Sequence, residues 1–229
     1  MPVDRVGEAM KRVVRRYRAI GRTAAGFARG KLRADPVSRQ IGELCPIPGP
    51  VTDFGCGRGQ LALLIAELQP ETVVNGIDWD AGKMESATRA ASSSDLVTFR
   101  VGDVRTAEIP LSGSILMVDV LHYHSTEIQD EMLEKATRAL IPGGVLLIRD
   151  LDDRRGWRSR LTVWQEHLAK WTRMHRGLTL SFRSADSICE HLEAMGLEVD
   201  VFDSSEHLPF GNVLIRAKKP AEVEAGPAA

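Results

Sequence analysis

The chain of 229 residues is long enough for one α/β domain with a full core, and 43% hydrophobic with 27% charged residues is typical of a soluble protein. Its three cysteines are odd in number and widely spaced, which argues against a disulfide framework and a zinc site. No apolar run reaches the length of a membrane span, and the first residues lack a signal-peptide core. We therefore expect a cytoplasmic protein without stable membrane insertion.

The formal net charge of −1 conceals a strong asymmetry along the chain. The first 34 residues contain ten lysines and arginines and only two acids, so this segment carries +8 and the remainder −9. Apolar residues recur at helical spacing between Val6 and Ile20, which predicts an amphipathic helix. We expect residues 1–35 to form a basic helical arm. Its basic face is solvated, contacts an anionic membrane or RNA, or meets an acidic partner, and the pattern leaves these alternatives open.

Strand-like and helix-like segments alternate after this arm. The predicted strands are 51–54, 73–78, 97–103, 114–121, 145–151, 197–203 and 212–219. The predicted helices are 60–69, 81–91, 126–140, 156–173 and 185–195. Because such alternation forms βαβ units, we predict a doubly wound α/β domain over 36–219, with helices on both faces of a mostly parallel seven-stranded sheet and a final antiparallel strand. Residues 220–229 show no burial pattern and are expected to be disordered.

The most informative segment is D-x-G-x-G-x-G from Asp53 to Gly59, directly after the first predicted strand. Gly55, Gly57 and Gly59 lack Cβ atoms, so they permit a tight turn and close approach of a ligand to the backbone. In an open parallel sheet, ligands bind beyond the carboxyl ends of the strands, where this loop is expected to lie. A dinucleotide-binding loop would have a third glycine where this chain has Gln60, and the Lys-Ser/Thr of a P-loop is absent.

The segment resembles the first motif of class I S-adenosylmethionine-dependent methyltransferases, and further motifs agree in order and spacing over about residues 36–219. In this family an acid at the end of the second strand accepts hydrogen bonds from both ribose hydroxyls, which implies that role for Asp78 in IDWD. Trp79 would then flank the adenine ring. The acid after the third strand, Asp103 in VGDV, would accept the adenine amino group.

The resemblance implies S-adenosyl-L-methionine as cofactor, S-adenosyl-L-homocysteine as product, and no metal. Asp53 and Asp119, near strand ends, are expected to favour the cationic parts of the cofactor. Backbone N–H groups of the loop and of the following helix would attract its carboxylate. Arg33 is a further candidate for that carboxylate, beside the alternative of a solvated surface arginine. The other expected cofactor contacts are Gly55, Cys56, Gly57, Gly59, Gly102 and Val104.

Candidate catalytic residues follow the fourth predicted strand. Methyl transfer is an in-line displacement at an activated carbon, so alignment supplies much of the catalysis and a base is needed only if the acceptor loses a proton. The family places residues beside the transferred methyl at this point, which here are His122 and Tyr123. A structural role for His122 remains open. The Asn/Asp-Pro-Pro-aromatic motif of amino-directed nucleic-acid methyltransferases is replaced by DVLH, so a nucleobase amine is not the expected acceptor.

A second basic and aromatic segment, 154–183, follows the fifth predicted strand. It contains eight lysines and arginines and a stripe of leucines and tryptophans at helical spacing. Family members commonly carry a lid over the substrate pocket here, although the stripe is also explained by packing on the body.

The two basic segments with apolar or aromatic stripes, 1–35 and 154–183, are expected to cover the substrate pocket. They predict an apolar or aromatic small-molecule acceptor with negative charge near it. The acceptor is free or presented by an acidic carrier protein, as in secondary metabolism, and oxygen is the default acceptor atom. The alternatives are a protein, lipid or RNA methyltransferase, and a non-catalytic protein that binds the cofactor. The sequence indicates no oligomeric state.

Overall fold

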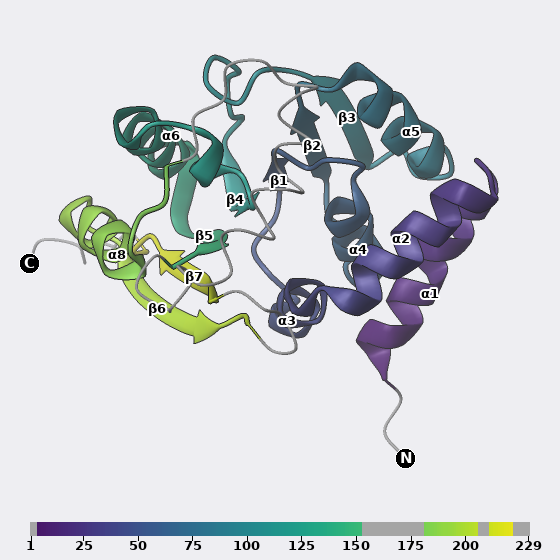
Figure 1. The fold of residues 1–229 in the computed structure, drawn as a ribbon, viewed down its shortest axis with the longest axis horizontal. Coiled ribbons are helices and arrows are strands. Elements are labelled where there is room, and N and C mark those ends of the chain that lie inside the picture. The colour runs from purple at the N-terminus through teal and green to yellow at the C-terminus, as the bar shows by residue number, and fades with distance from the viewer. Residues whose placement is uncertain (1–3, 153–180, 206–210, 222–229) are drawn as a thin grey trace, which may run out of the picture.

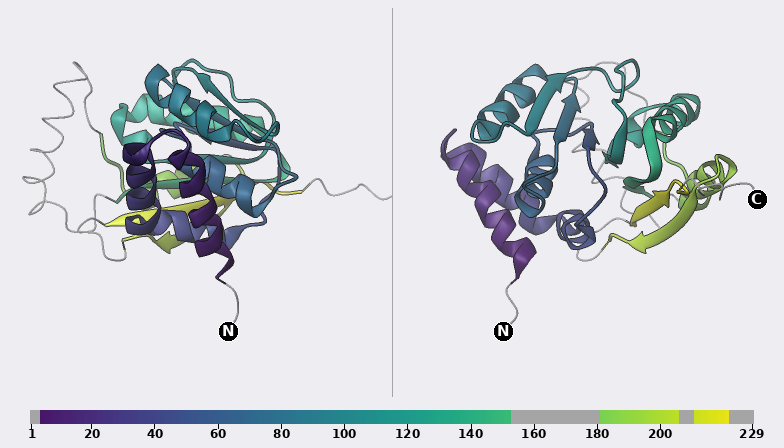
Figure 2. Two further views of the ribbon diagram at one scale, coloured as in Figure 1. Left: turned by 90° about the vertical axis from the view of Figure 1, so that its right-hand side faces the viewer. Right: turned by 180° about the vertical axis from the view of Figure 1, so that it is seen from behind.

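The computed structural model describes residues 4–152, 181–205 and 211–221. They form one seven-stranded sheet with helices on both faces, in the order β3-β2-β1-β4-β5-β7-β6 (Figures 1 and 2). The strands are Val51–Phe54 (β1), Val74–Asp78 (β2), Val97–Val101 (β3), Ser112–Val118 (β4), Leu140–Leu151 (β5), Glu198–Asp203 (β6) and Asn212–Lys218 (β7). Strands β1 to β5 pair in parallel, whereas β7 runs antiparallel to both β5 and β6. The predicted fold class is confirmed.

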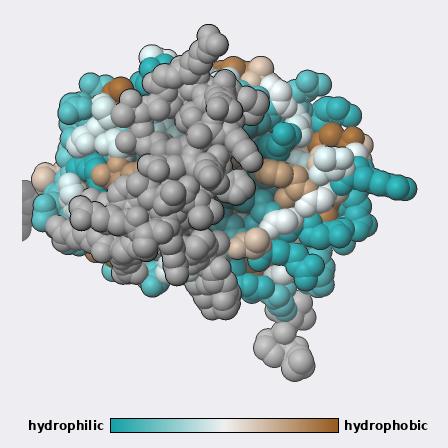
Figure 3. All heavy atoms as spheres, in the orientation of Figure 1, coloured by the Kyte–Doolittle hydropathy of each residue, from teal (hydrophilic) through white to brown (hydrophobic). Residues whose placement is uncertain are grey.

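The helices in these ranges are Arg5–Arg18 (α1), Arg22–Ala34 (α2), Pro36–Leu44 (α3), Gln60–Leu68 (α4), Ala81–Ala91 (α5), Thr126–Ala139 (α6) and Ala185–Ala194 (α8), and a 3₁₀ turn lies at Leu121–Tyr123 (η1). The predicted lid helix and all but the last three residues of the predicted lid lie outside the described residues, as does the tail beyond residue 221. Within the described part of the chain, no helix combines the length and apolarity needed to cross a membrane. The described surface in Figure 3 is mostly hydrophilic, with apolar residues in small separate areas.

Three helices, where the sequence predicts one, precede the first strand and pack on one side of the sheet (Figure 1). The apolar stripe of α1 buries Val13 and Tyr17 in the same core as α4. On its flank, Arg12 and Arg16 both bind the Glu67 carboxylate of α4, with Nε–O distances of 2.5 and 2.7 Å. These contacts join the basic segment to the sheet domain, and its boundary at residue 35 stays a prediction.

Strand order reverses at β1, because β2 and β3 lie on one side of it and β4 and β5 on the other. The carboxyl ends of these five parallel strands therefore meet at one edge, which is where such sheets bind ligands. Strand β4 ends three residues earlier than predicted, since Asp119 adopts a left-handed backbone with φ of 57°. Strand β5 begins earlier than predicted, at Leu140, and includes Pro142, Gly143 and Gly144.

Candidate functional site

The glycine loop, residues 55–59, leads from the end of β1 into α4. Gly55 and Gly57 have φ of 86° and 57°, values that other residues rarely adopt. A Cβ on Gly55 would lie 2.4 Å from a methyl of Val120, so this glycine is required for packing the loop on the β4 side. A Cβ on Gly57 would meet nothing within 4 Å. The loop therefore leaves open space at Gly57, next to which a ligand can approach the backbone.

The carboxylate of Asp78, at the end of β2, holds this loop in place. Its Oδ2 accepts a hydrogen bond from the Gly57 N–H at 2.9 Å, and its Oδ1 accepts one from the Asp80 N–H at 3.0 Å. A carboxylate has about four acceptor positions, so lone pairs remain for a pair of ribose hydroxyls. Trp79, which follows it, is 48% exposed and has the Lys83 ammonium 5.7 Å from its ring centre.

The turn after β3 holds three of the predicted residues. Asp103 forms an ion pair with Arg105 at 2.5 Å, and this hydrogen-bonded pairing holds the pKa of the carboxyl below its ordinary value. The Gly102 N–H donates to the Asp78 backbone oxygen at 3.0 Å, which joins the two strand ends, and Val104 is buried in the core. The Asp103 carboxylate is partly exposed and can accept hydrogen bonds from a ligand.

Asp53, inside β1, is almost fully buried, and its Oδ2 finds no hydrogen-bond partner among the described residues. Burial raises the pKa of Asp53 to about 7; the Ala62 N–H opposes this shift and the charge of Asp78 adds to it. A nearby cationic ligand would favour the charged form of this carboxyl group.

Cys56 lies in the glycine loop. Burial raises the pKa of its thiol and so disfavours the reactive thiolate.

Asp119 belongs to a charge cluster that we define as Lys31, Asp35, Asp119 and Arg149. Its carboxylate contacts the guanidinium of Arg149, and its N–H donates to the Arg149 backbone oxygen at 2.9 Å. The second guanidinium nitrogen of Arg149 lies 3.4 Å from Asp35. Lys31 on α2 lies 2.5 Å from Asp35 and 3.5 Å from Asp119. The cluster therefore joins the N-terminal helices to the ends of β4 and β5, and Asp119 is the only one of its four residues that was predicted as a site residue from the sequence.

His122 lies in η1, directly beyond the end of β4, and is paired with Asp150 near the end of β5. The Nδ1 atom of His122 lies 2.6 Å from Asp150 Oδ1, while the His122 N–H donates to Asp150 Oδ2 at 3.1 Å. Burial of the ring disfavours its charged form, but the charge and hydrogen bond of Asp150 outweigh this effect and raise the pKa of His122. The centre of the Tyr123 ring lies 4.1 Å from the centre of the His122 ring. Burial raises the pKa of the Tyr123 hydroxyl.

The predicted site residues thus lie after four neighbouring strands at one edge of the sheet. The end of β2 and the turn after β3 supply Asp78 and Asp103, the glycine loop follows β1, and Asp119 and His122 follow β4. This arrangement would suit a nucleoside with a charged amino-acid end, because the predicted acceptors for ribose and adenine, Asp78 and Asp103, lie on one side of the loop and a charge cluster on the other. No group of three or more side chains suited to a metal ion occurs among the residues that the structure describes.

The N-terminal helices also contact the glycine loop. The buried Tyr17 hydroxyl of α1 donates a hydrogen bond to the backbone oxygen of Arg58, and the Arg58 guanidinium lies 5.3 Å from the centre of the Phe27 ring of α2. Helices α1 and α2 are therefore a direct support of the loop. Helical spacing alone gave no signal for this contact.

Comparison with known proteins gives a consistent result. Residues 49–203 match the profile of the methyltransferase domain family. The chain is 23% identical over 156 residues to a carboxy-S-adenosyl-L-methionine synthase from Campylobacter curvus, covering 66% of this chain and 65% of that protein. It is 28% identical over 122 residues to a trans-aconitate 2-methyltransferase from Sinorhizobium fredii, covering 53% and 46%. The chain therefore spans about half to two thirds of the length of these relatives.

Among solved structures, an O-methyltransferase family protein from Burkholderia thailandensis has the same fold, with a TM-score of 0.68 and 19% identity. That match covers 90% of this chain and 63% of the other.

Proposed function

The chain belongs to the methyltransferase domain family of class I S-adenosylmethionine-dependent enzymes, and on this premise we propose that it methylates an oxygen atom of a small-molecule acceptor. The observation that carries the proposal is the His122–Asp150 pair at the carboxyl edge of the sheet, with its 2.6 Å hydrogen bond. An acceptor hydroxyl must lose a proton during methyl transfer, and a histidine oriented by a carboxylate is suited to accept it.

Each residue has a distinct role in this proposal. The bound cofactor supplies an electrophilic methyl carbon on positive sulfur. Asp78 and Asp103 hold the nucleoside, and the glycine loop admits it to the backbone. Asp150 holds Nδ1 of His122, so that Nε2 takes the acceptor proton as the new bond forms, and Tyr123 lines the acceptor side. The imidazolium so formed is stabilised by the Asp150 carboxylate.

We further propose an apolar or aromatic acceptor that carries negative charge, as occurs in secondary metabolism. The excess of arginine and lysine in 1–34 and in the predicted lid supports this acceptor class. The relative from Sinorhizobium fredii is named for methylation of trans-aconitate, which is a small molecule. The relative named as a synthase shows that this fold also serves cofactor chemistry other than methyl transfer, so a direct assay is needed.

The assay uses S-adenosylmethionine labelled in its methyl group, with panels of phenols and carboxylic acids and separate incubations with total RNA, protein and lipid. We expect the label in an ester or ether of a small molecule. Label only in RNA, protein or lipid would contradict the small-molecule acceptor. Calorimetric binding of S-adenosylhomocysteine without transfer to any acceptor would instead favour the non-catalytic alternative.

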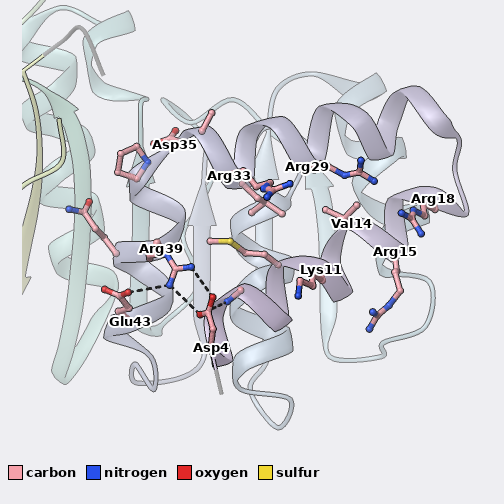
Figure 4. A pocket seen from close by; sticks show the side chains of 16 residues that line it. Asp4, Lys11, Val14, Arg15, Arg18, Arg29, Arg33, Asp35, Arg39 and Glu43 are labelled. Carbon is pink, nitrogen blue, oxygen red and sulfur yellow. Dashed lines mark hydrogen bonds and ion pairs between the residues drawn. The ribbon is translucent and has the colours of Figure 1, made fainter. Parts of the chain in front are cut away.

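A basic groove between α1, α2 and α3 supports presentation of the substrate by an acidic carrier protein (Figure 4). Its volume is about 1120 Å³, and it is lined by the cationic residues Lys11, Arg15, Arg18, Arg29, Arg33 and Arg39. Arg39 is paired with Asp4 at 3.1 Å, whereas Arg15, Arg18, Arg29 and Arg33 have no acidic partner among the described residues. The apolar residues Met10, Val14 and Leu32 also line the groove, and this combination of arginines and apolar side chains would complement an acidic amphipathic helix.

Charge reversal in this groove tests whether an acidic carrier protein docks there. We expect the double variant Arg15→Glu, Arg33→Glu to lower kcat/KM for a carrier-bound thioester about tenfold or more at low salt, because the electrostatic attraction that steers the carrier to the groove is lost. The same acyl group on N-acetylcysteamine should react unchanged, and the difference should shrink with salt, which screens exposed charges. The double reversal Arg22→Glu, Arg138→Glu, at exposed positions outside the groove, is the control. An equal loss with both substrates, or in the control, would exclude a docking role.

A further inference from the structure

The sheet topology gives the bound cofactor a direction. The acceptors for its nucleoside, Asp78 and Asp103, lie at β2 and β3, on one side of the glycine loop. Ligands of such sheets bind across the crevice at the switch point, which here lies between β1 and β4, so we place the amino-acid end of the cofactor toward the end of β4. That position is occupied by the charge cluster.

The amino-acid end carries an ammonium and a carboxylate, so it needs both an anion and a cation. Asp119 is the anion at this strand end, and its side chain is 29% exposed. Lys31, 3.5 Å from it, is 40% exposed and reaches the strand end from α2. The two side chains thus form a pair of opposite charges, of which each member can take one end of an amino-acid zwitterion.

The neighbouring arginines are engaged elsewhere. Arg149 is only 6% exposed, and its guanidinium contacts the carboxylates of both Asp119 and Asp35. Arg58 lies over the Phe27 ring. The side chain of Arg33, a candidate from the sequence, lines the basic groove with the other groove arginines in Figure 4. Among the described residues, Lys31 is therefore the cation that is both exposed and placed at the end of β4.

We infer that Lys31 binds the carboxylate of the cofactor's amino-acid end, while Asp119 accepts its ammonium group. Asp35 acts as a positioning residue, because its carboxylate holds Lys31 at 2.5 Å and is itself fixed as the N-cap of α3, accepting from the Val37 N–H at 3.2 Å. This inference rests on the proposed function and adds α2 to the cofactor site.

The test compares two ligands by calorimetry. S-adenosylhomocysteine carries the carboxylate, and 5′-S-(3-aminopropyl)-5′-thioadenosine is the same molecule without it. We expect Lys31→Met to weaken the first about 10- to 100-fold, as is usual for loss of a charge-assisted hydrogen bond, and to leave the second within about twofold of wild type. Lys31→Arg should recover part of the loss. Arg22→Met, which removes one positive charge from an exposed position of the same helix, should leave both affinities unchanged.

Each other outcome contradicts the inference in a recognisable way. Equal weakening of both ligands by Lys31→Met would show that the lysine only supports the fold of the site. An unchanged affinity for both would place the carboxylate elsewhere. Failure of the wild-type protein to bind either ligand would overturn the proposed function, and this inference with it. Equal thermal unfolding midpoints of the variants and wild type would confirm that folding is not the cause.

Discussion

Replacement of His122 by asparagine is expected to lower kcat for methyl transfer to a hydroxyl acceptor by about 10²- to 10⁴-fold, the range typical of a lost general base. The reason is that the acceptor oxygen would have no positioned group to take its proton. Affinity for S-adenosylhomocysteine should remain close to wild type, because the predicted cofactor contacts lie at other residues. A variant that loses affinity and turnover together would indicate a structural histidine.

The pH dependence separates a catalytic histidine from a structural one. The base must be neutral, and the pKa of His122 lies above its ordinary value of 6.5, so kcat/KM should rise as the pH increases through that higher value. Asp150→Asn removes the charge that raises the pKa of His122, while the burial that lowers it remains. The rise of kcat/KM with pH should therefore occur at lower pH in this variant. The maximum value of kcat/KM should also fall, because His122 is then a weaker base. If kcat/KM rose over the same pH range in this variant as in wild type, the role given to the His122–Asp150 pair would be contradicted.

Arg149→Met is expected to destabilise the protein by about 3–5 kcal/mol, because it removes a buried cation from the ionic cluster and leaves two carboxylates, Asp35 and Asp119, against the single cation Lys31. Arg149 lies in β5 and is buried, with the carboxylates of Asp119 and Asp35 on its two terminal guanidinium nitrogens. Urea unfolding at neutral pH measures the change in the free energy of unfolding.

The matched control is Arg216→Met, which breaks an exposed pair with Asp200 at 2.7 Å. Exposed pairs contribute about 0–1 kcal/mol, so this variant should be nearly as stable as wild type. Adding Asp119→Asn to Arg149→Met should restore part of the stability, because one uncompensated carboxylate is removed. Equal losses in Arg149→Met and Arg216→Met would show that the cluster does not stabilise the fold.

The sequence predicted those site residues that lie within or directly after a recognisable strand or loop pattern. Buried strands appear as apolar runs, and an acid directly after such a run, as at Asp78, indicates the carboxyl end of a strand in a parallel sheet. The glycine loop was recognised for the same reason, since its spacing between a strand and a helix is local. The roles of these residues in cofactor binding and catalysis stay predictions.

Most of the contacts that sequence reasoning missed join residues far apart in the sequence. The pairing of His122 with Asp150 follows from the register of β4 and β5, which aligns Val118 with Arg149. Lys31 lies at the end of β4 because of how α2 packs on the domain, and the spacing of apolar residues in the sequence does not predict that packing. The recognisable signal was an arginine and an aspartate, RD, at the end of an otherwise apolar strand, since buried charges are rare unless they are paired.

The Tyr17 hydroxyl, bonded to the Arg58 backbone oxygen, gives helix α1 two roles: its outer side lines the basic groove, and its inner side supports the glycine loop. Any ligand whose docking displaces this helix would perturb the glycine loop, and thermodynamic reciprocity requires a cofactor bound at that loop to alter the ligand's affinity by the same factor. Delivery of a substrate and retention of the methyl donor would then be energetically linked events on opposite sides of one helix.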